Sequence, residues 1–557
     1  MENKAIARKL RLLSQLMELH EVNPFKIKSI ANAAFNVDKF NGKIASKTFG
    51  ELEKISGIGK SVATKVMELV QLGTISELEE LIAGTPPGVV EMMGIKGIGA
   101  KKVAVIWRNM GIETIGELFY ACNENRLIEA KGFGLKTQEE IRKAIEFKMA
   151  STGKFLYAQV EPEADRIMEK LKFTFTNLLI DFAGEYRRLC EVVNELVVII
   201  GGRDCEIVYQ AILNSDLAND MKPEGDHITG TTENGLRLVF YVVEKRLFFK
   251  TLFIKTGNDE HVKAILERGG NDADQPENEE LIYKKAGLAF IKPELREGIT
   301  FIEKAATNTL PQLISYNDLQ GTLHNHSTWS DGVNTIEEMA AYCRDELNLQ
   351  YLGLCDHSKS AFYAKGLSIE RVLQQHEEID HLNKEMDGFH VFKGIESDIL
   401  NDGSLDYPEE ILKRFDFIVA SIHSNLKMSE EKATERLIKA IENPYTTILG
   451  HPTGRLLLSR NGYSIDYKRV IDACAANNVV IEINANPLRL DLDWRWHQYA
   501  LDKGVWLSIN PDAHRNEGFL DMHYGVIVGR KGGLYKERCL NALSLSEITQ
   551  FFKDKKK

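Results

Sequence analysis

The spacing of hydrophobic positions changes along this chain and predicts three kinds of region. In residues 1–50, apolar side chains recur every three or four positions, which indicates amphipathic helices that pack through Ile6, Leu10, Leu13, Leu16 and Met17. From residue 153 to about residue 250, helical and strand patterns are mixed. Beyond residue 320, short apolar runs alternate with helical stretches, which favours a parallel barrel.

The apolar runs of the C-terminal half end in side chains that bind metal ions. In a parallel barrel such groups collect at the C-terminal ends of the strands. Six strand ends each supply a ligand-type residue. At the first of them we expect a short buried strand at Thr322–His324, and the alternation of side chains along a strand then points His324 and His326 the same way. One histidine at a strand end is usually an ordinary hydrogen-bonded residue, but nine ligand-type side chains in register predict a metal site. These nine are His324, His326, Asp331, His357, Glu396, His423, His451, Asp512 and His514.

Three glycine hairpins interrupt the helical pattern of the first 140 residues. They lie at residues 55–61, at residues 95–102 and, in a looser form, at residues 130–137. Glycine lets the backbone approach a phosphate closely, and the helix that follows offers free N–H groups. One Gly-x-Gly is a common helix turn, but three copies predict DNA binding through the backbone, without reading of sequence. The residues expected to contact DNA are Gly57, Gly59, Lys60, Gly97, Gly99, Lys101, Lys102, Gly132 and Gly134.

Composition and charge narrow the class of protein. A chain of 557 residues is expected to hold several domains, and 43% hydrophobic with 27% charged residues is typical of soluble globular proteins. Seven cysteines without paired spacing indicate reduced thiols in the cytoplasm, and we expect neither a signal peptide nor a membrane span. The net charge is −11, yet residues 1–150 hold 22 Lys/Arg against 18 Asp/Glu, which permits phosphate contact at that end. Eleven of the 14 histidines lie beyond Gln320, which assigns the metal chemistry to that half.

Family-like motifs surround the ligand positions. Together with Gly450-His-Pro-Thr-Gly-Arg455 and Glu482-Ile-Asn-Ala-Asn-Pro487, the ligand pattern resembles the PHP (polymerase and histidinol phosphatase) phosphoesterase domain. The whole chain resembles bacterial family X DNA polymerases that carry this domain. The resemblance implies a multidomain fold: a helix-hairpin-helix lyase-like domain (1–80), a fingers-like helix-hairpin-helix domain (81–150), an α/β nucleotidyltransferase-like palm (151–250), a thumb (251–315) and a distorted (β/α)7 PHP barrel (316–557).

The resemblance also implies the chemistry of the PHP domain. Its nine ligands are expected to hold three divalent ions, and imidazole with carboxylate suits Mn²⁺ or Zn²⁺ better than Mg²⁺. Mn²⁺ is the expected ion, with Zn²⁺ or a mixture as the alternative. The implied activity is 3′–5′ exonuclease, with cleavage at abasic sites as a further expectation. Asp331 and His357 are assigned to catalysis, and Arg455, Lys359 and Lys365 are candidates for holding the substrate phosphate; each of these three could instead form a surface ion pair.

The palm departs from the family pattern, in which three carboxylates on adjacent strands align two Mg²⁺ ions. The family signature is Gly-Ser-x-Arg-Arg, then Gly-Asp-x-Asp and a third Asp on a later strand. This chain has Gly184-Glu-Tyr-Arg-Arg188, then Glu195 and Val197 at the carboxylate pair, and Val239 at the third position. One carboxylate of three remains, so we expect polymerase activity to be lost. Asp204 and Glu206 lie nearby in the sequence, and we predict that both are surface residues. Residues 269–280 are predicted to form a polar loop.

Lys65 follows the first hairpin in a stretch that resembles the lyase domain of polymerase beta. There a lysine forms a Schiff base with an abasic sugar, and a lysine of lowered pKa can act as this nucleophile. The neighbouring lysine expected at Ser61 is absent. A lysine that is solvated or contacts phosphate is therefore favoured over a lyase nucleophile.

Three other functions stay open. The whole-chain resemblance suggests a working polymerase, although the palm residues contradict it. A phosphatase for a small phosphomonoester would have no use for three DNA-binding hairpins, and a catalytically silent DNA-binding scaffold conflicts with nine ligand positions. DNA is the expected partner, no membrane contact is expected, and a monomer is the simplest expectation for an oligomeric state that the sequence leaves undetermined.

Overall fold

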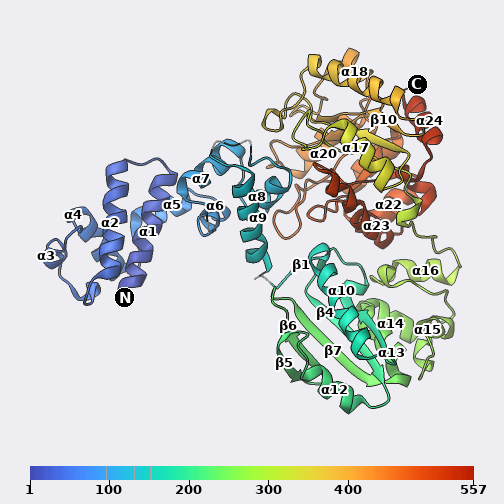
Figure 1. The fold of residues 1–557 in the computed structure, drawn as a ribbon, viewed down its shortest axis with the longest axis horizontal. Coiled ribbons are helices and arrows are strands. Elements are labelled where there is room, and N and C mark those ends of the chain that lie inside the picture. The colour runs from blue at the N-terminus through green and yellow to red at the C-terminus, as the bar shows by residue number, and fades with distance from the viewer. Residues whose placement is uncertain (96, 129, 131, 151–152, 557) are drawn as a thin grey trace. The chain divides into compact units, whose positions relative to one another are not determined.

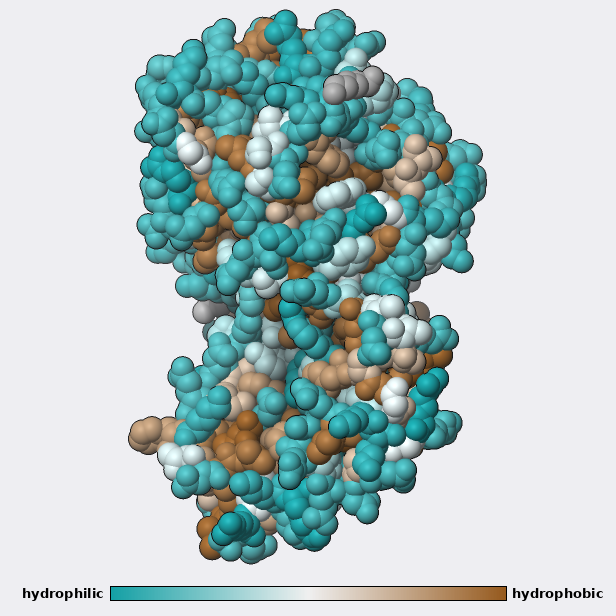
Figure 2. Space-filling view, turned by 90° about the vertical axis from the view of Figure 1, so that its right-hand side faces the viewer, coloured by the Kyte–Doolittle hydropathy of each residue, from teal (hydrophilic) through white to brown (hydrophobic). Residues whose placement is uncertain are grey.

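The computed structural model describes residues 1–95, 97–128, 130, 132–150 and 153–556, with the backbone alone at 147–150. The chain divides into two compact units, Met1–Glu146 (unit 1) and Phe147–Lys557 (unit 2), and Figure 1 draws their helices and strands coloured by residue number. Each unit buries apolar side chains of its own. Among the described residues, no helix combines the length and the apolar composition needed to cross a membrane. The face shown in Figure 2 is mostly hydrophilic, with apolar side chains in separate groups between polar ones.

Unit 1 is helical, as its hydrophobic spacing predicts. The predicted apolar face of the first helix is confirmed, because Ile6, Leu10, Leu13 and Met17 are fully buried. The helices are α1 (Asn3–Leu19), α2 (Pro24–Lys39), α3 (Phe49–Leu52), α4 (Lys60–Leu72), α5 (Ser76–Ala83), α6 (Pro87–Met92), α7 (Ala100–Ala104), α8 (Ile115–Asn123) and α9 (Leu135–Ala150), the last of which runs past the unit boundary.

The first glycine has the same backbone conformation in all three hairpins. Their first glycine has a positive φ, of 82° at Gly57, 94° at Gly97 and 92° at Gly132, which suits a residue without Cβ. Their second glycine comes directly before a helix, since Gly59 and Gly99 are the N-caps of α4 and α7, and α9 begins after residue 134. Each hairpin therefore leads into a helix N-terminus with free N–H groups. Lys96 and Lys131 of these motifs lie outside the described residues.

Unit 2 begins with a five-stranded sheet that is covered by helices on both faces. Its strand order is β2-β4-β7-β6-β5, with β4 and β7 parallel and the other pairs antiparallel. One side of β4 packs with α10 and α12 and the other side with α13, so the strand is buried on both faces. The elements are β1 (Phe155–Leu156), α10 (Tyr157–Thr174), β2 (Leu179–Ala183), α11 (Gly184–Arg187), β3 (Val192–Val193), β4 (Glu195–Gly202), α12 (Cys205–Leu213), β5 (Asn219–Glu224), β6 (His227–Thr231), β7 (Arg237–Glu244) and α13 (Phe248–Thr256).

Three helices follow, α14 (Asp259–Glu267), α15 (Glu279–Lys285) and α16 (Thr300–Ala306), and a buried ion-pair network links α15 to α11. The predicted polar loop at residues 269–280 is wrong at its end, because Glu279 begins α15 and is buried. Its carboxylate accepts hydrogen bonds from Arg296 Nη1 (2.5 Å) and Arg187 Nη2 (2.6 Å). Two guanidinium partners compensate the burial of one carboxylate.

The C-terminal part of unit 2 contains two parallel sheets, β10-β9-β8 and β11-β12-β13-β14-β15. Isolated parallel bridges pair His357 with Glu396 and Asn325 with Ala513, at the C-terminal ends of these strands. The predicted alternation of strands and helices is confirmed. The elements are β8 (Gly321–Thr322), α17 (Ile336–Ala341), β9 (Tyr351–Leu354), α18 (Ile369–Glu385), β10 (His390–Lys393), β11 (Glu396–Asp398), α19 (Glu409–Leu412), β12 (Val419–Ser421), α20 (Glu430–Ile441), β13 (Ile448–Leu449), α21 (Tyr467–Ala476), β14 (Val480–Asn484), α22 (His497–Asp502), β15 (Leu507–Asn510), α23 (Met522–Lys531) and α24 (Leu545–Lys555).

Candidate metal centre

Seven of the nine predicted ligand residues come shortly after a parallel strand, whereas Glu396 is the first residue of β11 and Asp331 lies in the loop that follows β8. The expected strand Thr322–His324 is wrong in its second half, because β8 ends at Thr322 and His324 takes a left-handed φ of 61°. Asp512, which follows β15, is also left-handed, with a φ of 55°. Such a conformation costs a non-glycine residue free energy and persists where the surroundings enforce it, often at a functional site.

The structure brings all nine side chains together in overlapping groups. Within each group the potential ligand atoms lie within 4.8 Å of one another, and the side chains are buried except for a half-buried His423. Glu396, His324, His326 and His357 each belong to two groups, so the groups form one continuous site. The groups are His326, Asp331, His357 and His514; His324, His451 and Asp512; His324, His326 and Glu396; and His357, Glu396 and His423.

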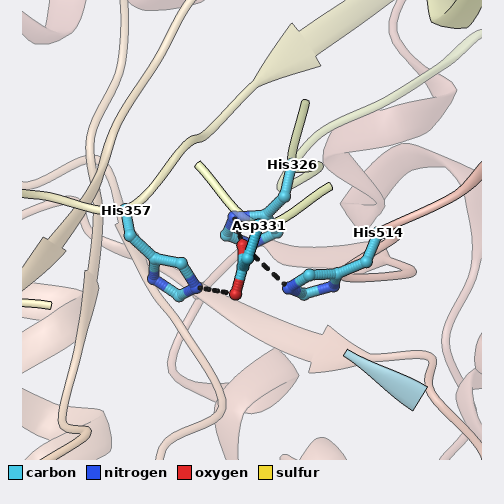
Figure 3. A group of neighbouring side chains, drawn as sticks. All are labelled: His326, Asp331, His357 and His514. Atoms are coloured by element: carbon cyan, nitrogen blue, oxygen red, sulfur yellow. Dashed lines mark ion pairs between the residues drawn. The ribbon is translucent and has the colours of Figure 1, made fainter. Parts of the chain in front are cut away.

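Asp331 lies between two histidines in the first of these groups (Figure 3). Its Oδ2 is 3.5 Å from His357 Nε2, and its Oδ1 is 3.4 Å from His514 Nε2 and 3.9 Å from His326 Nδ1. These separations are long for hydrogen bonds. They suit atoms that surround a shared cation, each at about 2.0–2.2 Å from it.

Glu396 faces five imidazoles, the farthest being His326, whose Nε2 lies 3.7 Å from Oε2. Its Oε1 lies 3.0 Å from His451 Nε2, 3.1 Å from His423 Nε2 and 3.2 Å from His324 Nε2. Its Oε2 lies 2.8 Å from His357 Nδ1. A buried carboxylate with two oxygens in such surroundings can serve more than one cation.

Two carboxylates outside the predicted ligand set orient its histidines. Glu482 Oε2 accepts a hydrogen bond from His324 Nδ1 at 2.7 Å, and Asp398 Oδ1 accepts one from His423 Nδ1 at 2.6 Å. Because a carboxylate only accepts, Nδ1 holds the proton and Nε2 is presented to the site. The sequence places Glu482 in a family-like run, yet neither partnership could be read from it.

The charges in the site balance one another. Burial lowers the pKa of His324, but Glu482, Asp512 and Glu396 outweigh burial and raise it well above its usual value. Burial raises the pKa of Glu396, but the surrounding histidines lower it well below its usual range. Burial and two neighbouring histidines lower the pKa of His326 to about 3, so this imidazole is neutral at pH 7. Cations that bind here would replace protons on the histidines whose pKa is raised.

Buried atoms without a hydrogen-bond partner test whether the site fits metal ions. Among the described residues, these atoms include His324 Nε2, His326 Nδ1 and Asp331 Oδ2. Buried polar atoms are normally paired, and an unpaired one costs free energy. All three point into the groups above and are of the kinds that bind Mn²⁺ or Zn²⁺, so the residues fit divalent ions.

The predicted phosphate-binding residues lie in different surroundings. Arg455 is largely buried, and it donates to Asp493 Oδ2 (2.6 Å) and to the Arg489 carbonyl (2.9 Å). The sequence left a surface ion pair open as the alternative, whereas this pair is largely buried. Lys359 is exposed, with Nζ 5.8 Å from the ring of Tyr407, and Lys365 is exposed with a left-handed φ of 58°. Sequence reasoning missed Arg489, whose buried Nε lies 3.9 Å from Asp512 Oδ2.

The lysines of the hairpins differ in their partners. Lys60 is exposed, and Lys101 is exposed with Nζ 4.0 Å from Glu18. Lys102 Nζ donates to the Gly97 carbonyl (3.3 Å) and lies 5.5 Å from the ring of Phe133. Lys102 is therefore used within the chain, whereas Lys60 and Lys101 present their charge to solvent.

Lys65 is held by an acidic partner. Its Nζ is 2.5 Å from Glu77 Oε2, and Lys26 Nζ is 2.5 Å from the other oxygen of the same carboxylate. The side chain of Lys65 is 13% exposed. The ion pair with Glu77 gives Lys65 a structural partner within the chain.

The three positions of the palm site are neighbours in the sheet. Val197 of β4 pairs directly with Val239 of β7, and Glu195 lies two residues before Val197 on the same strand. Both valines are buried against Phe248 and Leu252. Glu195 is partly exposed and lies 3.4 Å from Arg237 Nε. The predicted surface position of Asp204 and Glu206 is confirmed, because both are exposed.

Comparison with known proteins identifies the family. Residues 1–75 match the helix-hairpin-helix domain, and residues 89–146 match the SAM-like helix-hairpin-helix tandem. Over 99% of its length the chain is 34% identical to the DNA polymerase/3′-5′ exonuclease PolX of Bacillus subtilis, whose whole length is covered. It is 29% identical over 186 residues (32% of the chain, 73% of the relative) to a probable phosphatase of Thermoanaerobacter sp.. A probable phosphatase of Caldanaerobacter subterraneus is 39% identical over 105 residues (18% of the chain, 39% of the relative). The chain therefore belongs to the bacterial family X DNA polymerases that carry a C-terminal PHP domain.

Proposed function

We propose that this protein is a metal-dependent 3′–5′ exonuclease whose PHP domain hydrolyses DNA held by the helix-hairpin-helix motifs. The proposal rests on one observation, the convergence of nine His, Asp and Glu side chains from six strand ends into one site. The names of the relatives support it, since an exonuclease and a phosphatase both hydrolyse phosphoesters. Cleavage at abasic sites is a further activity that we propose for the same site.

We propose that the nine ligands hold three divalent cations, with Mn²⁺ preferred and Zn²⁺ or a mixture as the alternative. When bound, such cations polarise the phosphoryl group and stabilise the leaving oxygen. The chain's own groups prepare the site. Glu482 and Asp398 keep Nε2 of His324 and His423 directed inward, and the guanidinium of Arg489 puts positive charge beside Asp512, where an anionic substrate would arrive.

The domain plan follows from the same family relationship. We propose the five domains at residues 1–80, 81–150, 151–250, 251–315 and 316–557. We also infer that the two parallel sheets and the bridges between them form the distorted (β/α)7 barrel of the PHP fold. Side chains at the strand ends of such a barrel converge on one face, which accounts for the position of the metal site.

The nuclease proposal is tested with single-stranded oligonucleotides labelled at the 5′ or the 3′ end and incubated with Mn²⁺. A 3′–5′ exonuclease shortens the 5′-labelled strand stepwise, whereas a phosphatase for small monoesters leaves its length unchanged. His324→Ala and Asp512→Ala each remove a ligand from the shared site, and we expect a loss of at least about 1000-fold, or ~4 kcal/mol.

The matched control is His381→Ala, which replaces an exposed histidine of α18 that pairs with Glu385. It should degrade DNA at the wild-type rate. Wild-type rates in both ligand variants would show that the hydrolytic site lies elsewhere.

The space around two hairpin glycines supports DNA contact by the hairpins. A Cβ at Gly59 or Gly99 would meet no atom of the described chain within 4 Å, and both residues have an ordinary negative φ. Nothing in the described chain therefore requires glycine at these two positions. A DNA phosphate that approaches the helix N-terminus explains the missing side chains.

We propose that template-directed polymerisation is lost. Two of the three carboxylate positions are buried valines, and the remaining Glu195 lies beside Arg237 rather than in a carboxylate cluster. The two arginines that follow Glu185 are also engaged. Arg187 donates to Glu279 and Arg188 donates to Glu297 (2.9 Å), so a triphosphate would have to displace buried ion pairs.

Lys65 has an ordinary structural role in this proposal, because Glu77 holds it as an ion pair. Borohydride trapping on an abasic oligonucleotide tests it directly. We expect the Lys65→Ala variant and the wild type to give the same result, with no covalent adduct that depends on Lys65. An adduct lost in Lys65→Ala but kept in Lys26→Ala would assign the lyase function to Lys65 after all.

A further inference from the structure

The loop that follows His357 carries an exposed phenylalanine, Phe362. The side chain of Phe362 is 84% exposed, although most phenylalanines of this chain are buried. It lies in a short 3-10 turn, Phe362–Ala364, between the exposed residues Lys359 and Lys365. An exposed phenylalanine on a protein surface needs no explanation by itself. Its surroundings give it one.

The loop is fixed rather than loose. The Ser360 backbone N–H and hydroxyl both donate to Asp406, at 2.6 and 2.5 Å. A Cβ at Gly366 would lie 2.0 Å from the Ser358 carbonyl oxygen, so the chain closes on itself at that point. The Leu367 N–H donates to the His357 carbonyl at 2.9 Å. These contacts hold the Phe362 ring in water, although the exposure of an apolar ring to water costs free energy.

The loop also reaches the metal centre. The ring centroid of Phe362 is 6.1 Å from that of Tyr363, and the ring of Tyr363 is 6.4 Å from that of His357. His357 belongs to two of the ligand groups. One aromatic side chain therefore separates Phe362 from the site.

We propose that Phe362 is the stacking surface for the nucleobase at the 3′ end of a single-stranded substrate, with Lys359 and Lys365 attracting the adjoining backbone. This inference rests on the proposed nuclease function and names its substrate class. Exposed aromatic rings interleaved with cationic side chains are the combination that binds single-stranded nucleic acid without regard to sequence. A small phosphomonoester has no base to stack, so the loop gives the site its preference for DNA ends.

Steady-state kinetics with two substrates test the proposal. One oligonucleotide ends in a normal 3′ nucleotide, and the other ends in a tetrahydrofuran abasic residue. Phe362→Ala should raise KM for the normal end by about 5- to 150-fold, the equivalent of ~1–3 kcal/mol per stacked base, with kcat unchanged. On the abasic end Phe362→Ala should change nothing, and Phe362→Trp should keep the wild-type KM on both substrates.

The matched control is Phe173→Ala, which removes an equally exposed phenylalanine (87%) from α10. It should leave both substrates unaffected. Since Phe362 is exposed, its replacement should leave the melting temperature unchanged, so a loss of binding cannot be attributed to unfolding.

A second readout needs no turnover. With EDTA present, an oligonucleotide that ends in 2-aminopurine should lose fluorescence on binding wild-type protein or Phe362→Trp, because stacking quenches this base, but not on binding Phe362→Ala. Equal quenching by wild type and Phe362→Ala would overturn the stacking proposal while leaving the nuclease proposal intact. A wild type without exonuclease activity would overturn both.

Discussion

Replacing Glu482 by glutamine should weaken metal binding although Glu482 is not one of the nine proposed ligands. The carboxylate is fully buried and accepts four hydrogen bonds. Its Oε2 accepts from His324 Nδ1 (2.7 Å) and Asn510 Nδ2 (2.9 Å), and its Oε1 accepts from the His451 N–H and Asn484 Nδ2, both at 3.1 Å. Each oxygen therefore faces two donors.

Glutamine has the same size but replaces one of these acceptors by an NH₂ donor. If the NH₂ group faces His324, this imidazole must move its proton to Nε2, where it blocks the cation. If the NH₂ group faces the other way, the backbone N–H of His451 loses its acceptor. Either orientation disturbs a proposed ligand, and lost orienting partners typically weaken metal binding by about 10- to 100-fold, or ~1.4–2.7 kcal/mol.

The assay is calorimetric titration of chelator-stripped protein with Mn²⁺, followed by exonuclease rates over a range of Mn²⁺ concentrations. Glu482→Gln should need about 10- to 100-fold more Mn²⁺ for half its maximal rate and recover much of that rate at saturation. Glu409→Gln is the control, because Glu409 is an exposed acceptor for the Tyr445 hydroxyl (2.9 Å). Wild-type Mn²⁺ affinity in a folded Glu482→Gln protein would refute the reasoning.

Three further outcomes are expected. Gly57→Val with Gly97→Val should weaken DNA binding similarly for all sequences and with strong salt dependence; a folded double variant with wild-type affinity, measured by fluorescence anisotropy, would count against hairpin contact. Primer extension should be undetectable in the His324→Ala background, where new ends are not degraded, and robust extension with Mg²⁺ or Mn²⁺ would show that the palm is misaligned. Burial lowers the pKa of His261 from 6.5 to about 4, so the unfolded chain binds the extra proton first and stability is lost as the pH falls from 6.5 towards 4. His261→Gln should therefore lose less stability than wild type between pH 7 and pH 5, by up to about 2 kcal/mol in urea unfolding, and an equal loss in both proteins would contradict this.

The polar network around the candidate metal centre also engages an arginine that the sequence offered for holding phosphate. Arg455 lies in a family-like run, yet Asp493 and two backbone carbonyls occupy its guanidinium. One of these carbonyls belongs to Arg489, whose side chain lies next to Asp512. A distant ion pair therefore helps to shape the site without entering it.

The sequence by itself predicted those features that repeat along the backbone. Helical spacing predicted the buried face of α1, and the Gly-x-Gly repeats predicted the three hairpins, because both depend on neighbours a few positions apart. The ligand set could be proposed for the same reason. Parallel strands end on one edge of a sheet, so residues at their C-terminal ends converge wherever those strands lie in the sequence.

Partnerships between distant side chains were decided only by the tertiary structure. His324 and Glu482 are 158 positions apart, and no periodicity relates them. The burial of Glu279, at the end of a run that looks like a polar loop, depends on Arg187 and Arg296 arriving from other segments. Lys65 has the sequence surroundings of a nucleophile, but the carboxylate of Glu77 reaches it from the next helix. Local spacing determines which way a side chain points, whereas the charge and hydrogen bonds that it meets are set by the packing of remote elements.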